Sequence, residues 1–127
     1  MSEVVELIKM PAKEVAITMY RTENGLDPLI KQVKDRLKGV VHDVTTVKGR
    51  KAYASDARKI ASSKMVIENQ GKEFSAEYKK IPAQIDAERR RAFNELEKFQ
   101  TEFRKPLTDW EEAEESRVNA LKDRLNH

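Results

Sequence analysis

The sequence contains no cysteine and few of the residues from which catalytic sites are usually built. Without cysteine the chain can form neither a disulfide nor a reactive thiolate, which fits a reducing compartment. Its two histidines, His42 and His127, and its four glycines leave few ways to combine a nucleophile with a base or to build a metal cluster. We therefore expect a protein that is not an enzyme and that uses no cofactor and no metal.

Long apolar runs are also absent. No stretch approaches the ~20 consecutive apolar residues that a membrane-spanning helix requires. Residues 1–6 lack the basic region and the apolar core of a signal peptide. We expect a cytoplasmic protein with no membrane partner.

Apolar residues are too scarce for a broad core. They make up 39% of the chain, aromatic residues 6% and charged residues 37%. This balance suits a narrow seam between long helices that are otherwise solvated. The length of 127 residues allows one domain at most, or a small domain attached to a helical arm. The net charge of +3 permits nucleic-acid binding without requiring it.

Residues 45–126 form one long stretch with almost no turn signals. Apolar residues recur in it at spacings of three, four and seven, which is typical of helices that pack against other helices. A hairpin rarely covers such a seam alone, so we expect a homo-oligomer. Its aromatic residues could instead stack on bases, but the leucines between them favour a core or seam. The candidate oligomer seam consists of Ile60, Ile67, Phe74, Ile81, Phe99, Phe103 and Trp110.

Two prolines and one glycine are the points at which this stretch could bend. A proline inside a helix costs ~3 kcal/mol, so we expect a hairpin turn near Pro82, with Pro82 opening the second helix. The alternative is a single kinked helix, because the seam keeps its helical phase across Pro82. Near Pro106 we expect a kink or a short break, with a capping box of Thr108 and Glu111 starting a new helix. Gly71 is expected inside a continuous helix.

Residues 1–44 predict a small N-terminal head with short strands. Residues 14–20 alternate in polarity and are rich in β-branched and aromatic side chains, which favours a strand. Residues 40–44 are a second extended candidate that could pair with the first, and residues 4–8 a third. The expected fold class is therefore mainly α: a long antiparallel helical hairpin at residues 45–127 that follows an α+β head of one or two strands and one helix.

Capping residues mark the helix of this head. Asp27 suits an N-cap, Pro28 the first helical position, and Gly39 the residue that follows the last turn. Thr45 or Thr46 is expected to cap the long helix that comes next.

Basic residues recur along the long stretch. If they line one groove of the folded protein, they could contact DNA phosphates; if they scatter, they are a solvated surface. Carboxylates close by favour local ion pairs for several of them. The candidate nucleic-acid contacts are Lys48, Arg50, Lys51, Lys79, Lys80, Arg89, Arg90, Arg91, Arg104 and Lys105.

Charge is distributed unevenly about Pro106. Basic residues concentrate before it, whereas five carboxylates follow it within residues 109–115. Opposite charges on a shared seam suggest an ordered, antiparallel self-association as readily as they suggest DNA binding.

Four segments resemble uncharacterised phage and prophage proteins of coiled-coil type. They are residues 43–51 (DVTTVKGRK), 60–64 (IASSK), 85–89 (IDAER) and 104–111 (RKPLTDWE). The likeness extends over residues 26–117, and it implies an early-region protein encoded near recombination and replication functions. A looser likeness, in topology alone, is to Gam-type phage proteins, which bind DNA ends.

Two functions follow as expectations. The first is a non-enzymatic interaction protein in the cytoplasm of a host cell, which self-associates and binds a phage or host protein in recombination or replication. The alternative is a DNA-binding accessory factor that contacts phosphates through a basic helical face.

Overall fold

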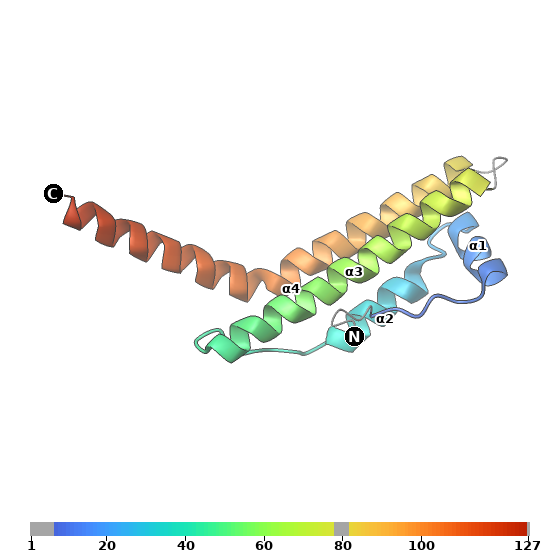
Figure 1. Ribbon diagram of the computed structural model, residues 1–127. Helices are drawn as coiled ribbons and strands as arrows, with labels where there is room; N and C mark the ends of the chain where they lie inside the picture. Colours follow the sequence, from blue (N-terminus) through green and yellow to red (C-terminus); the bar gives the residue numbers. More distant parts are fainter. Residues whose placement is uncertain (1–6, 78–81, 127) are drawn as a thin grey trace.

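The computed structural model describes residues 7–77 and 82–126. These residues form four helices: α1 (Lys13–Arg21), α2 (Asp27–Leu37), α3 (Val47–Glu77) and α4 (Pro82–Leu125). Figure 1 shows α3 and α4 side by side and antiparallel, with α1 and α2 along one side of the pair. The end of α4 leaves this body and carries the C-terminus away from it (Figure 1). The mainly α class is confirmed.

The seven-residue repeat of α3 forms the centre of the core. Ile60, Ile67 and Phe74 are each at most 2% exposed and pack with Ile85 and Leu96 of α4 in one buried cluster. Each repeat advances α3 by two turns and returns its apolar side chain to the face that meets α4.

Gly71 permits the close approach of the two long helices. It lies inside α3, so the expected continuous helix is confirmed. A Cβ atom at this position would lie 2.5 Å from Cδ of Arg89 in α4. The absence of a side chain therefore lets the Arg89 stem cross the surface of α3.

The hairpin connection is flanked as expected. α3 ends at Glu77 and α4 begins at Pro82, whose missing N–H costs nothing at the start of a helix. The alternative of a single kinked helix is wrong, because α3 and the part of α4 up to Leu107 lie side by side and antiparallel. The turn residues 78–81, with Ile81 of the seam and the candidate contacts Lys79 and Lys80, lie outside the described residues.

The predicted strand at residues 14–20 is wrong. This segment belongs to helix α1, which buries Ala16 and Tyr20, four residues apart. The Tyr20 hydroxyl donates to the Ile67 carbonyl at 2.6 Å, and its ring meets Phe74 edge-on at 5.4 Å. Contacts with α3 thus outweigh the strand preference of the local sequence.

The other extended segments form no strand within the described residues. Residues 40–43 have no regular structure, and Val41 is 80% exposed, so no partner strand covers it. The third candidate, residues 4–8, lies mostly outside the described range; the backbone N–H of Leu7 donates to Ser63 Oγ at 2.7 Å. The expected α+β head is therefore replaced by helices packed on the hairpin.

Helix α2 occurs where its capping signals predict it. Pro28 lies in its first turn, and Gly39 follows the C-cap with φ of +75°. The N-cap, however, is Leu26 and not Asp27. Asp27 is the first helical residue, and its carboxylate receives a hydrogen bond from Arg91 at 2.7 Å.

Of the two threonines before α3, Thr46 acts as the cap. Its Oγ1 accepts a hydrogen bond from the Gly49 N–H at 2.9 Å. The backbone N–H of Thr45 instead donates to Asp43 Oδ1, also at 2.9 Å.

Helix α4 bends in the region of Pro106, and the expected capping box does not start a new helix there. Helix α4 is continuous through Pro106 and changes direction in its orange part (Figure 1). Proline removes one helical hydrogen bond there and crowds the preceding turn, which bends the helix. Thr108 and Glu111 do not cap a new helix, because α4 continues through them. Both side chains instead accept hydrogen bonds from Arg104, one and two turns earlier.

Candidate interaction surface

Within residues 7–77 and 82–126, the last part of α4 is a long helical segment with no buried residue. We call residues 108–125 the arm; it projects from the helical body in Figure 1. Leu107 is 3% exposed, and none of the described residues after it is buried. Leu121 and Leu125 are 48% and 78% exposed. The arm is therefore a helix with solvent on all sides beyond its base.

Apolar side chains nevertheless follow one face of the arm. The positions 107, 110, 114, 118, 121 and 125 are three or four residues apart and so lie on one side of an α-helix. Only one of these positions is polar. We call this face the apolar stripe; it consists of Leu107, Trp110, Glu114, Val118, Leu121 and Leu125.

The base of the arm is held by arginines. The Arg50 guanidinium lies 4.0 Å from the centre of the Trp110 ring, and its Nη1 donates to the Val44 carbonyl at 2.7 Å. Arg104 donates from Nη1 to Thr108 at 2.8 Å and to Glu111 at 2.9 Å. These contacts tie the first turns of the arm to α3 and to the straight part of α4.

Charge reverses along the arm. The carboxylates occur within residues 109–115, whereas Arg117, Lys122 and Arg124 follow, with Asp123 among them. Glu114 and Arg117, neighbours where the charge changes sign, form an ion pair at 2.6 Å. The hydrogen bond from Arg117 lowers the pKa of Glu114 below its ordinary value.

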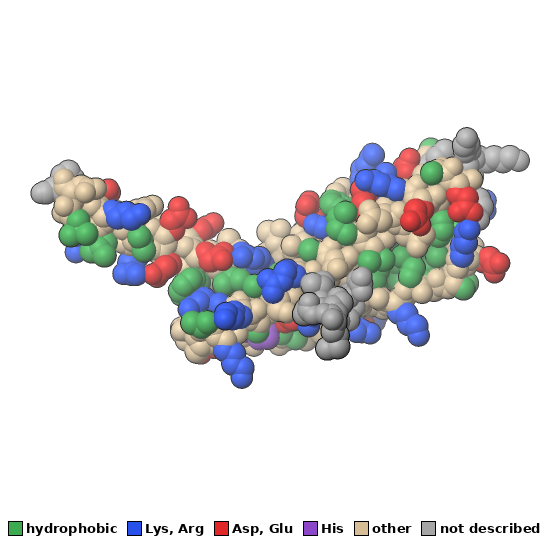
Figure 2. All heavy atoms as spheres, in the orientation of Figure 1, with side chains coloured by type: hydrophobic (Ala, Val, Ile, Leu, Met, Phe, Trp, Pro, Cys, Tyr) green, Lys and Arg blue, Asp and Glu red, His purple; other side chains and the backbone are tan. Residues whose placement is uncertain are grey.

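The candidate nucleic-acid contacts that the structure describes do not form one free basic face. Five of them are engaged within the chain: Arg50 with Trp110, and Arg89, Arg91, Arg104 and Lys105 with carboxylates. Lys48, Lys51 and Arg90 are exposed and form no ion pair with the described residues. Figure 2 shows basic and acidic side chains interspersed over the face that it presents.

The candidate seam is divided between the interior and the partly covered surface. Ile60, Ile67 and Phe74 are buried within the chain itself, so a second copy cannot reach them. Phe99 and Phe103 are half-buried against the same core, and Phe103 meets Tyr53 of α3 edge-on at 5.5 Å. Of the seam residues that the structure describes, Trp110 alone belongs to the arm.

A buried carboxylate joins the N-terminal helices to the hairpin. Glu88 of α4 is 6% exposed, accepts the Leu26 N–H at 2.8 Å and pairs with Arg91, also at 2.8 Å. Hydrogen bonds to Glu88, and then to Asp27, raise the pKa of Arg91. The spacing of Glu88 and Arg91 along the chain predicts an ion pair. Nothing in the sequence indicates that Glu88 also accepts the N–H of Leu26, the N-cap residue of α2.

A second ionic cluster links α3 to α4. Arg89 pairs with Glu68 at 2.8 Å and with Asp86 at 3.3 Å, and the Ser75 hydroxyl donates to Asp86 at 2.6 Å. The hydrogen bond from Ser75, with a smaller effect of Arg89, lowers the pKa of Asp86. These bonds hold the two helices in register near their connection.

His42 contacts two side chains of α3. Its Nε2 lies 2.8 Å from Asp56 Oδ2, and its ring meets Tyr53 edge-on at 4.8 Å. No hydroxyl nucleophile is bonded to this pair within the described residues, so the arrangement anchors the loop before α3.

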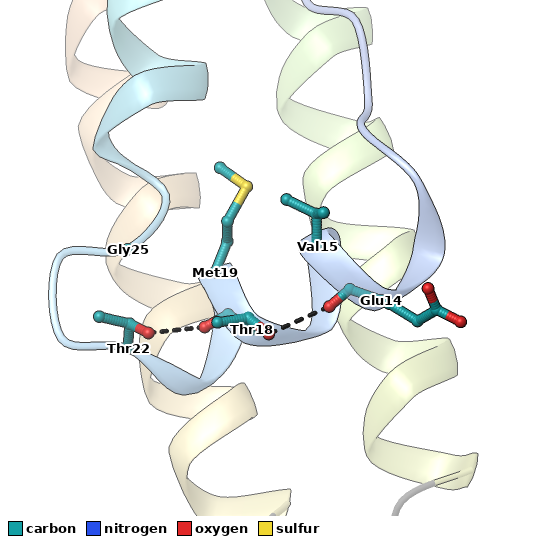
Figure 3. A pocket seen from close by; sticks show the side chains of 6 residues that line it. All are labelled: Glu14, Val15, Thr18, Met19, Thr22 and Gly25. Carbon is teal, nitrogen blue, oxygen red and sulfur yellow. Dashed lines mark hydrogen bonds between the residues drawn. The ribbon is translucent and has the colours of Figure 1, made fainter.

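A hollow beside α1 offers apolar surface but no converging polar groups. Figure 3 shows Val15 and Met19 projecting side by side from the helix. The hydroxyls of Thr18 and Thr22 are bonded to carbonyls one turn earlier, at 3.1 and 2.6 Å (Figure 3). The hollow is lined by Glu14, Val15, Thr18, Met19, Thr22 and Gly25.

The described residues form neither a metal-binding cluster nor a membrane-spanning helix. Among residues 7–77 and 82–126, no three His, Cys, Asp or Glu side chains are grouped so that they could hold a metal ion. No helix in this part of the chain has the length and apolar character needed to cross a membrane.

Comparison with known proteins adds no functional assignment. The chain matches no protein-family model, no curated protein and no solved structure.

Proposed function

We propose that this protein is a non-enzymatic helical interaction protein that self-associates through its arm. The observation that carries the proposal is the outer part of the apolar stripe, with Val118, Leu121 and Leu125, which packs against no other element of the described chain. A dimer would cover part of this stripe with the same stripe of a second copy.

The energetics of a lone helix support this proposal. An isolated helix of this length is marginal in water, because most helical stability in proteins comes from packing one face. Burying a leucine side chain contributes about 1.5–3 kcal/mol. Leu121 and Leu125 contribute little of this while they remain 48% and 78% exposed.

The wider context of the proposal comes from the sequence resemblance. The phage-type segments favour a role in recombination or replication inside a host cell, with a phage or host protein as a further partner. Residues 43–51 and 104–111, two of these segments, form the loop and helix turns that hold the base of the arm.

Sedimentation of the intact chain tests self-association. We expect a dimer or higher oligomer at micromolar concentration, and a monomer when Leu121→Glu and Leu125→Glu are combined. Val41→Glu is the matched control, because Val41 is 80% exposed but lies in the loop before α3. A monomeric wild-type chain at these concentrations would refute the proposal.

DNA binding is a second candidate function. The observation in its favour is that Lys48 and Lys51 are exposed at the start of α3 and unpaired within the described chain. Phosphate contacts would make DNA affinity fall steeply as salt rises, and Lys48→Glu with Lys51→Glu would reduce that salt dependence. Affinity that is unchanged by this double substitution would count against these two residues.

A further inference from the structure

We infer that the partner of the arm is the arm of a second copy, paired in the antiparallel direction. This inference rests on the proposed self-association and adds its orientation and register. It places Ser116 near the two-fold centre of the pair, so that positions whose numbers add up to about 232 face each other.

The spacing of the apolar stripe supports this register. Reversal about position 116 exchanges 107 with 125 and 114 with 118, and brings 110 to within one residue of 121. Trp110 would then meet Leu121 of the second copy, and Glu114 would meet Val118. Leu107 is 3% exposed and stays in the core of its own chain. The part of the stripe beyond Leu107 is therefore complementary to itself when one copy is reversed.

The reversal of charge along the arm supports the same orientation. In a parallel pair the carboxylates of residues 109–115 would face the same carboxylates of the second copy. In the antiparallel pair they face residues 117–123, where two of the three charged side chains are basic. Flanking charges of this kind determine partner choice and orientation in coiled coils.

One pair of flanking residues illustrates the match. Glu111 and Lys122 each follow a stripe position by one residue, so they lie on the same flank of the helix. In an antiparallel pair, this flank of one arm lies against the same flank of the other arm. The register then places Glu111 of one copy across from Lys122 of the other. Glu111 already pairs with Arg104, but its side chain is 48% exposed and its oxygens can accept a further donor.

The direction of the arm is compatible with this pairing. The arm is about 27 Å long at a rise of about 1.5 Å per residue, and it points away from the body (Figure 1). Antiparallel arms place the two bodies at opposite ends of the pair. Parallel arms would bring the two bases together, with Lys48 and Lys51 of each copy at the same end.

Glu114 makes the pairing selective. It is the one polar position of the stripe, it lies next to the centre, and it keeps its ion pair with Arg117 at 2.6 Å. A polar residue at a seam position lowers stability but specifies register. In the proposed register Glu114 faces Val118, whereas in a parallel pair two copies of Glu114 would face each other.

Site-specific cross-linking in the full chain tests the orientation, since the chain has no cysteine of its own. Glu111→Cys and Lys122→Cys chains are made separately, mixed, and treated with a short bismaleimide. We expect a covalent dimer from the mixture and little from either variant alone, because equal positions are about 15–18 Å apart along antiparallel arms. Glu112→Cys, on the opposite face, mixed with Lys122→Cys is the control that should stay uncrosslinked.

Sedimentation and circular dichroism of the same samples separate the outcomes. Dimers that cross-link when each variant is alone would overturn the antiparallel inference and leave self-association intact. Folded dimers that cross-link in no combination would overturn pairing through the arm. Folded monomers, including the wild-type chain, would overturn both the inference and the proposed function.

Discussion

At the scale of single residues, a few buried polar groups attach the N-terminal helices to the hairpin. Glu88 is the clearest, because it satisfies the Leu26 N–H and the Arg91 guanidinium together. Tyr20 has a similar role, since its ring fills the core while its hydroxyl reaches the Ile67 carbonyl. Burial raises the pKa of Tyr20, so its hydroxyl remains a donor at neutral pH.

Replacing Glu88 is expected to loosen the N-terminal helices. Glu88→Ala leaves the buried Leu26 N–H unpaired and removes one partner of Arg91, which should lower the free energy of unfolding by about 2 kcal/mol. Urea unfolding measures this change. Glu95→Ala, at an exposed position of the same helix, should change stability little. Equal effects of the two substitutions would contradict the assigned role.

The pKa of Asp86 predicts a pH-dependent contribution from Ser75. The hydrogen bond lowers the pKa of Asp86 in the folded chain, so its stabilisation is complete at neutral pH and is lost as the pH falls through that lowered pKa. Ser75→Ala should therefore lower Tm at neutral pH, with the difference from wild type shrinking in acid. Ser62→Ala on the same helix is the control; a Ser75→Ala difference that is constant across pH would exclude this linkage.

At the scale of elements, α4 has two parts with different environments. Up to Leu107 it is one half of the hairpin, with Ile85, Ala92 and Leu96 buried. Beyond Leu107 it is the arm, which the cation–π contact of Arg50 and the bonds of Arg104 hold only at its base. Pro106 lies at the junction of the two parts.

Pro106→Ala is expected to straighten α4. The substitution restores an N–H donor and relieves the clash with the preceding turn, which together are worth up to ~3 kcal/mol in a helix interior. Spin labels on cysteines introduced at Lys48 and Asn119 should report a shorter distance, because a straight arm would continue alongside the start of α3. Labels at Arg58 and Lys98 serve as the control pair within the body. An unchanged first distance would mean that Arg50 and Trp110, and not proline, set the bend.

At the scale of the whole molecule, the buried core and the surface proposed for self-association are located in different places. The buried core lies between Leu7 and Leu107, whereas the apolar stripe extends beyond it. The free energy of folding of the body should therefore be nearly independent of the outer arm.

Deletion of residues 113–127 tests this separation. The shortened chain keeps Trp110 and Glu111, and with them the contacts of Arg50 and Arg104 at the arm base. We expect a monomer whose Tm, at a concentration where wild type is dissociated, lies within a few degrees of the wild-type value. A large loss of Tm in the monomer would show that the outer arm stabilises the body within one chain.

The sequence alone was sufficient where a local rule determined the structure. The repeat of Ile60, Ile67 and Phe74, the opening of α4 by Pro82, the positive φ of Gly39 and the bend at Pro106 depend on side-chain spacing or on backbone chemistry within a few residues. Such rules need no knowledge of distant contacts. The charge reversal along the arm can be read from the sequence in the same way.

The tertiary structure decided what depends on residues distant in the chain. Residues 14–20 have strand-like composition, yet the pocket for Tyr20 on α3 makes them helical. Thr108 and Glu111 match a helix start, yet both side chains accept hydrogen bonds from Arg104 inside a continuous helix. Ile60, Ile67 and Phe74 of the long seam lie in the interior of one chain, because α4 folds back over them. Among the described residues, the extension of the seam into the arm stays exposed at Leu121 and Leu125.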